Sequence, residues 1–147
     1  MKKIIFSFLI LFIFNLCVFA QKNTNHKKIG LPANIGEIKG ADSDRLLKNP
    51  AIKIRLKRLL GKKNYAAFLE SFETVTPIVK KGAFLFSSGC LIHACTHLES
   101  AIAIDLVNKS IHSAIYRQNK RTRYFNEKGR RTPGTIKLWA NRVSALN

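Results

Sequence analysis

The chain has 147 residues, with 26 lysines and arginines against 8 aspartates and glutamates, which gives a net charge of +18. This length is that of one domain, and the charge attracts polyanions and anionic membranes while it repels basic proteins. The sequence contains no P-loop, no dinucleotide-binding fingerprint and no cysteine–histidine set with zinc spacing, so no cofactor or metal is expected.

Residues 1–20 have the pattern of a secretory signal peptide. Two lysines precede an apolar run over residues 4–19, and the small residue Ala20 stands at the expected cleavage site. The run is slightly short for a membrane span, which argues against an uncleaved anchor. Lipidation at Cys17 is disfavoured because bulky residues, 14–16, precede it. We therefore expect a periplasmic or secreted protein that is cleaved after Ala20.

Cleavage there would leave a chain of 127 residues with 24 basic and 8 acidic side chains, a net charge of +16. Such a chain is large enough to form one hydrophobic core without many cross-links. Its two remaining cysteines are Cys90 and Cys95. An export signal and an even number of cysteines favour a disulfide bond over two free thiols.

The segment over residues 21–41 is polar, basic and interrupted by glycine and proline, which is typical of a flexible arm. The folded domain is then expected over residues 42–147. A short helix that includes Leu46-Leu47 should follow the capping side chains of residues 42–44. Asn49-Pro50, a cap followed by a first-turn proline, predicts a longer helix over residues 51–60 that ends at Gly61.

Apolar residues recur at helical spacing in this helix and again over residues 64–72. Basic residues fill the other positions of the first helix, so a helix lying on a membrane surface is one interpretation. Packing in the core is the commoner role of such stripes, and we expect it here. The two apolar sets are Ile52, Leu56, Leu59 and Leu60, and then Tyr65, Phe68, Leu69 and Phe72.

The apolar period then changes to two, which predicts β-strands. The expected strands cover residues 74–80, 83–88, 101–107, 111–117 and 120–126, with Pro77 marking the first as an edge strand or a bulge. A final helix should begin at residues 133–135, with an apolar set of Ile136, Leu138, Trp139 and Val143. The order predicts an α+β fold, an antiparallel sheet of four to five strands with the N-terminal helices and the C-terminal helix on one face.

The most informative stretch lies over residues 87–97, between two predicted strands. Cys90 and Cys95 are separated by four residues, and His93 lies between them. We expect a disulfide-closed loop that presents one imidazole from a rigid sheet. On the loop-entropy model, a ring of about six residues restrains the unfolded chain by about 2 kcal/mol. A loop that is ordered in advance also loses less entropy on binding.

Several roles are compatible with this pattern. The bridge can simply staple a turn and leave His93 solvated. Metal binding by His93, His97 and His112 is disfavoured because oxidised cysteines supply no thiolate and no carboxylate pattern accompanies them. A redox pair is disfavoured because the spacing is not Cys-x-x-Cys. The remaining role is to plug the active site of another protein.

The loop resembles that of the Ivy family, the inhibitors of vertebrate (C-type) lysozyme. The family pattern is Gly/Ala-Cys-x-x-His-x-Cys, and the order of elements over residues 42–139 is also similar to that family. The matching residues in this chain are Gly89, Cys90, Leu91, Ile92, His93, Ala94 and Cys95.

The resemblance implies that this loop enters the lysozyme cleft and that His93 contacts the two catalytic carboxylates, held in place by Cys90 and Cys95. It therefore implies a binding protein and not an enzyme. Family loops usually carry proline before the histidine and aspartate after it, where this chain has Ile92 and Ala94. C-type lysozymes are basic, so a partner of this charge would be repelled at long range.

A second hypothesis is a basic envelope module that binds lipopolysaccharide, anionic lipid or nucleic acid. Such binding would fall steeply with salt and would not depend on His93. The sequence leaves open whether the protein forms a homodimer. The basic clusters are Lys53-Arg55-Lys57-Arg58 with Lys62-Lys63, Arg117-Lys120-Arg121-Arg123, and Lys128-Arg130-Arg131.

Overall fold

The computed structural model describes residues 29–38, 40 and 43–146. The predicted signal peptide, Cys17 and much of the predicted arm lie outside the described residues. The elements in chain order are η2 (Ala33–Glu37), α2 (Ser43–Lys48), α3 (Pro50–Glu70), β1 (Thr74–Val75), β2 (Val79–Lys81), β3 (Phe84–Cys90), β4 (Leu98–Asp105), β5 (Ser110–Arg117), β6 (Arg123–Asn126), η3 (Glu127–Gly129) and α4 (Gly134–Ala145).

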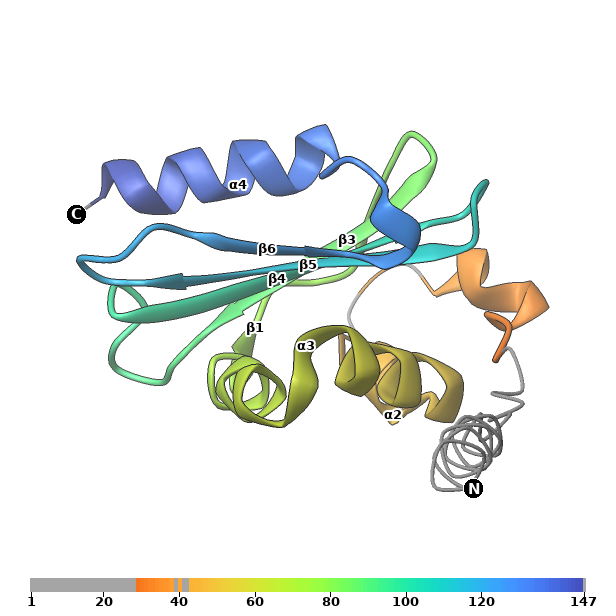
Figure 1. Cartoon of the computed structure of the whole chain (residues 1–147), viewed down its shortest axis with the longest axis horizontal. Helices are drawn as coiled ribbons and strands as arrows, with labels where there is room; N and C mark the ends of the chain where they lie inside the picture. The colour runs from red at the N-terminus through yellow and green to blue at the C-terminus, as the bar shows by residue number, and fades with distance from the viewer. Residues whose placement is uncertain (1–28, 39, 41–42, 147) are drawn as a thin grey trace, which may run out of the picture.

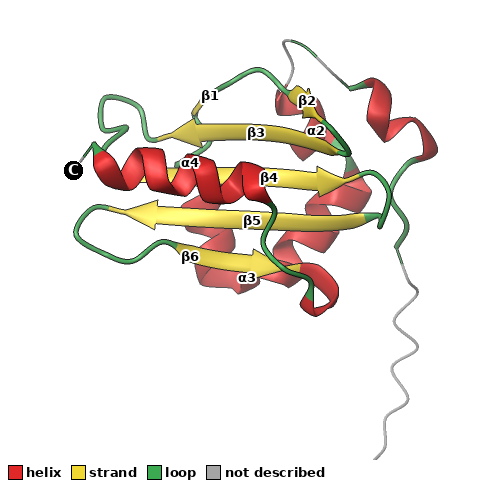
Figure 2. Cartoon of the chain, turned by 90° about the horizontal axis from the view of Figure 1, so that it is seen from above, coloured by secondary structure: helices red, strands yellow, loops and turns green. Residues whose placement is uncertain are grey.

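The strands form one antiparallel sheet in the order β1-β3-β4-β5-β6, and β2 also pairs with β3 (Figure 2). The α+β class and the antiparallel sheet are therefore confirmed. The first predicted strand is divided into β1 and β2 around Pro77, whose ring removes a backbone donor from the ladder. Because of this division, the sheet has six strands within the described residues, where the sequence predicted four to five.

Helices cover both faces of the sheet, with α2 and α3 on one side and α4 on the other (Figure 1). Alternate residues of β4 supply both layers. Ile102 and Ile104 pack in the cluster that contains the α3 side chains, whereas Ala101 and Ala103 pack in the cluster that contains Trp139 of α4. Small side chains on the second face let α4 and its indole lie close to the strand.

This arrangement differs from the prediction that all helices share one face. Each layer has its own apolar cluster, because a sheet without polar alternation must be covered on both sides. The apolar set of α4 also differs at one position. Ile136, Trp139 and Val143 are buried, but Leu138 is 71% exposed because two residues along a helix turn it about 200° from Ile136.

The helical pieces predicted over residues 51–60 and 64–72 are both present as parts of α3, and a kink separates them. Asn49 caps the first, because its Oδ1 accepts hydrogen bonds from the backbone N–H of Ala51 and Ile52. Gly61 has a left-handed backbone (φ 70°), so the helix path breaks where the sequence predicted it. The apolar sets pack in the core as expected except for Leu69, which is 41% exposed, and the ring centroids of Phe68 and Phe72 lie 4.6 Å apart.

The described part of the segment that the sequence predicts as a flexible arm joins the core. Ile35 in η2 is completely buried, and the backbone of Gly40 pairs with that of Ile78. The apolar residues of this stretch (Ile29, Leu31, Ile35 and Ile38) are interrupted by glycine and proline and follow neither a helical nor a strand period, so the sequence did not indicate this contact. Among the described residues, no helix combines the length and the apolar character that crossing a bilayer requires.

Asp105 closes the turn between β4 and β5 and is only 4% exposed. Burial by itself would raise the pKa of its carboxyl, but the hydrogen bonds donated by Asn108 and Val107, with His112 nearby, lower that pKa overall. One oxygen accepts the N–H of Val107 at 3.0 Å and of Asn108 at 2.8 Å. The other accepts the Asn108 side-chain amide at 2.8 Å. The ionised carboxylate therefore stabilises this turn.

We expect Asp105→Asn to lower the free energy of unfolding at pH 7 by about 1–2 kcal/mol, because the variant faces the same donors without the charge. Folding lowers the pKa of Asp105, so its contribution is complete above the unfolded value of about 4 and is lost as the pH falls through the folded value. The difference between variant and wild type should therefore shrink on acidification below about pH 4, as measured by urea unfolding.

The matched control is Asp44→Asn, whose side chain is 68% exposed and pairs with Lys48 at 3.4 Å. It should change stability by less than about 0.5 kcal/mol. A loss in Asp105→Asn that stays constant from pH 7 to pH 3 would contradict the argument from ionisation.

Candidate functional site

The loop that connects β3 to β4 spans residues 91–97. It leaves the sheet at Cys90 and returns at Leu98, and Cys90 is disulfide-bonded to Cys95 with a Cα–Cα distance of 4.6 Å. The bridge predicted from the sequence is thus present. Inside the ring, the backbone N–H of Leu91 donates to the carbonyl of Leu98 at 3.0 Å and extends the β-ladder into the loop.

Two tight turns shape the rest of the loop. The N–H of Ala94 donates to the carbonyl of Leu91, and the N–H of His97 donates to the carbonyl of Ala94, both at 3.0 Å. His93 lies in the first turn with a left-handed backbone (φ 58°). Histidine and asparagine adopt this conformation more often than most residues other than glycine.

The seven predicted site residues divide by orientation. Ile92 is 51% exposed and His93 is also exposed, so both are available to a partner. Leu91 faces the other way and packs against the core cluster next to α3. Ala94 is half-buried, and Gly89 is buried within β3 and lies outside the loop. The structure therefore exposes the imidazole next to an outward isoleucine, while Leu91 anchors the loop to the core.

Gly89 fixes the base of the loop against the end of α3. A Cβ at this position would lie 2.9 Å from the carbonyl oxygen of Ser71 and 3.0 Å from Cα of Phe72. Ser71 is itself held, because its hydroxyl bonds to that of Ser100 and to the carbonyl of Phe68. Only glycine permits this close approach of two backbones.

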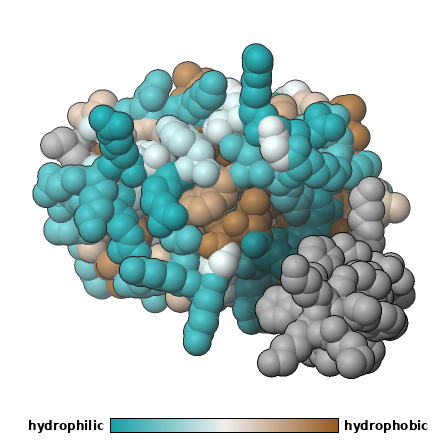
Figure 3. Space-filling view, viewed as in Figure 1, coloured by the Kyte–Doolittle hydropathy of each residue, from teal (hydrophilic) through white to brown (hydrophobic). Residues whose placement is uncertain are grey.

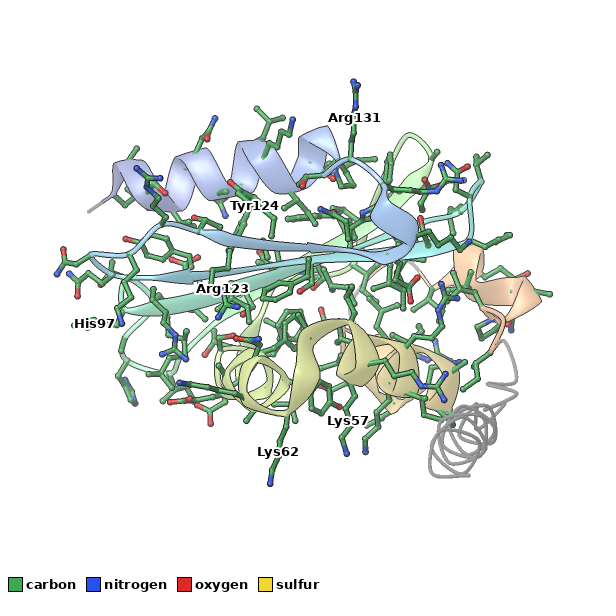
Figure 4. All side chains as sticks on the ribbon, in the orientation of Figure 1. Lys57, Lys62, His97, Arg123, Tyr124 and Arg131 are labelled. Atoms are coloured by element: carbon green, nitrogen blue, oxygen red, sulfur yellow. A yellow bond between two sulfur atoms is a disulfide. The ribbon has the colours of Figure 1, made fainter. Side chains whose placement is uncertain are left out.

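A second contact supports the far end of the loop. The N–H of Gln118, in the turn between β5 and β6, donates to the carbonyl of His97 at 3.0 Å. The loop and this turn therefore lie side by side at one end of the sheet, where Figure 4 shows His97. This neighbour could not be predicted from the sequence, because a contact between two backbones does not depend on the choice of side chain.

Charges near the loop are unequal. Glu99 lies opposite Cys90 in the β3–β4 ladder. Burial raises the pKa of its carboxyl, although the charge of Arg142 in α4 lowers it. Three arginines and a lysine, in contrast, surround a hollow between α3 and the β5–β6 hairpin. Four cations and no carboxylate thus line this hollow.

The structure corrects the prediction for one residue of the basic cluster over residues 53–63. Arg55 is only 9% exposed, because its guanidinium forms an ion pair with Glu127 and also donates to the carbonyl of Lys109 at 2.8 Å. A buried pair of this kind joins α3 to η3 and β5, so Arg55 is structural and unavailable to an anionic polymer. Lys53, Lys57 and Arg58 of the same cluster are exposed.

The structure does not bring His93, His97 and His112 together as a metal site. His112 is buried in β5, where its ring nitrogens bond to Ser110 at 3.1 Å and to Asn126 at 2.8 Å. His93 and His97 are exposed in the loop. Within the part of the chain that the structure describes, no three histidine, cysteine, aspartate or glutamate residues form a group that could hold a metal ion.

Comparison with known proteins identifies one family. The family model described as "Inhibitor of vertebrate lysozyme (Ivy)" matches residues 51–145, which include α3 from its second residue, the whole sheet and α4. Neither a curated protein nor a solved structure matches the chain significantly.

We expect Gly89→Ala to destabilise the fold by about 1–3 kcal/mol, because a methyl group at this site must displace the backbone of Ser71 or Phe72. Gly134→Ala is the matched control, since a Cβ there has no neighbour within 4 Å. Urea unfolding of both variants measures the difference. Equal stability of the two variants would show that the end of α3 moves at little cost and does not fix the base of the loop.

Proposed function

Because this chain belongs to the Ivy family of inhibitors of vertebrate lysozyme, we propose that it inhibits a C-type lysozyme by inserting residues 91–97 into the active-site cleft. The observation that carries the proposal is an exposed imidazole, His93, on a loop closed by the Cys90–Cys95 disulfide. The protein is then exported, with residues 1–20 removed as a signal peptide, and acts outside the cytoplasm.

The chemistry of the target explains why an imidazole suits this role. A lysozyme needs one carboxyl group protonated as the general acid and a second one ionised. An imidazole can donate a hydrogen bond from one ring nitrogen and accept one at the other. Placed between the two carboxyl groups, His93 engages both and excludes the sugar from the site. No bond is made or broken, so the protein acts as a stoichiometric binder.

The geometry of the loop favours tight binding. The disulfide, the two internal turns and the bond from Gln118 restrict the backbone around His93 before any partner arrives. A loop that is already ordered loses less conformational entropy on association. Ile92, which is half-exposed beside the imidazole, adds apolar surface that the cleft can bury. Ala94 supplies no charge, so the interaction with the carboxyl groups depends on His93.

We expect His93→Asn to weaken inhibition by about 30-fold or more, which is the loss typical of an interface hot spot. Asparagine tolerates the left-handed backbone of this position, so the melting temperature should stay within a few degrees of the wild type. His97→Asn is the matched control, because it removes the other exposed imidazole of the same loop. Inhibition constants against a purified C-type lysozyme provide the measurement.

The same variants test the competing hypothesis of an envelope module for anionic polymers. Binding to such a polymer should decline steeply with salt and should be equal in wild type and His93→Asn. Full inhibitory activity in His93→Asn, or no inhibition by the wild type at low and at physiological salt, would contradict the proposal.

We also expect the double variant Cys90→Ser, Cys95→Ser to lose about 2 kcal/mol of stability, the loop-closure value for a ring of this size. Its inhibition should weaken because the loop must be ordered during binding. Dithiothreitol added to the wild type should reproduce the weaker inhibition and should not affect the double variant further. An unchanged inhibition constant in the double variant would show that the bridge does not order the loop for binding.

A further inference from the structure

A small hollow lies between α3 and the β5–β6 hairpin. Asn64 and Ala67 contribute to it from α3, Ile115 and Arg117 from β5, Lys120 and Arg121 from the turn, and Arg123 from β6. Ala67 and Ile115 are buried and form an apolar floor, and the four cations are exposed around it. Figure 3 shows an apolar area between the sheet and α3, ringed by hydrophilic side chains.

The cations of this hollow have no carboxylate partner within the described part of the chain. The ion pairs Lys48–Asp44 and Arg55–Glu127 lie away from it, and no acidic residue lines the hollow. Arg123 is nevertheless held in place, because it donates to Asn64 Oδ1 at 2.8 Å and lies over the ring of Phe125 at 5.3 Å. Four positive charges in one place repel one another, and a bound anion relieves that repulsion.

The hollow lies beside the loop that carries His93. Leu98 at the end of the loop pairs with Arg117, and the Gln118 N–H bonds to the carbonyl of His97. Neighbouring strands are about 4.8 Å apart, whereas a typical interface of about 800 Å² per partner is about 30 Å across. An enzyme seated on the loop therefore covers the hairpin as well.

We propose that this hollow receives a carboxylate from the rim of the target's cleft and so selects lysozymes whose rim is acidic. The inference rests on the proposed function and specifies the partner. Guanidinium groups bind carboxylates through two parallel hydrogen bonds, which gives direction as well as attraction. A rim with lysine or arginine at this point is repelled, and like charges placed opposite each other are an effective device against wrong partners.

The distribution of the remaining charges favours a protein carboxylate over a long anionic polymer. A polyanion needs a continuous track of cations. Lys57 and Lys62 project from α3 away from the sheet, and Arg131 projects on the opposite side of the molecule (Figure 4). Arg123 lies on the side of the sheet that faces α3, so the hollow opens in a different direction from the side chains of Lys57, Lys62 and Arg131.

The test combines two inhibitors with two forms of one enzyme. The inhibitor variant is Arg117→Gln with Arg121→Gln, and the control with the same change in charge is Arg130→Gln with Arg131→Gln, which lie beyond the far end of β6. The enzymes are a basic C-type lysozyme and the same lysozyme with two basic residues of the cleft rim replaced by glutamate. Inhibition constants are measured for each pair at low and at physiological salt.

We expect the acidic rim to strengthen inhibition by the wild type and by the control variant by about tenfold, as close charge pairs at interfaces do. The gain should be absent for the Arg117, Arg121 variant, whose unaltered melting temperature would show that it is folded. This inference would be wrong, and the proposed function would still stand, if the wild type inhibited both enzymes equally. The same holds if the control variant also failed to inhibit the acidic-rim enzyme more strongly.

Two other outcomes also decide the matter. If the wild type inhibits neither enzyme, the proposed function fails and this inference fails with it. If the Arg117, Arg121 variant inhibits both enzymes as the wild type does but loses binding to an anionic polymer such as heparin, the hollow serves a polyanion and the assignment to the enzyme rim is wrong.

Discussion

The antiparallel pairing of β4 with both β3 and β5 is the constraint on which the rest of the structure depends. The ladder joins Cys90 to Glu99 on one side and Leu98 to Arg117 on the other. Because antiparallel strands reverse at their ends, the loop that follows β3 and the turn that follows β5 must emerge at the same end of the sheet. This pairing places an imidazole and a group of cations on one surface, although they lie far apart in the sequence.

The order of the loop comes from several contacts, each with a different physical origin. The disulfide limits the separation of Cys90 and Cys95, the close approach at Gly89 fixes the base against α3, and the Gln118 bond fixes the far end. Core packing of Leu91 adds an apolar contact that holds one side of the loop inward. Together these contacts favour one loop conformation in the free protein, which is what a binder that acts by shape requires.

The large positive charge of the chain has more than one role. Arg55 is buried and neutralised by Glu127, so it joins α3 to η3 and contributes little to the outer field. The cations around Asn64 and Ile115 lack acidic partners in the described part of the chain and act on whatever approaches the loop. In the proposed function, charge at this place governs the choice of partner and the rate of association, and the imidazole acts inside the cleft.

The sequence by itself determined the class of the fold, the position of most elements, the break at Gly61 and the bridge around His93. These features depend on local signals, namely apolar period, capping and glycine, and on a cysteine pair without competitors. Only the tertiary structure decided that α4 covers the second face, that Arg55 is buried and that the hairpin lies beside the loop. The apolar run at residues 101–104 is typical of a strand covered on both faces, but the prediction still placed all helices on one face. Burial and neighbourhood across strands are set by the register of the sheet, and no short window of sequence contains that information.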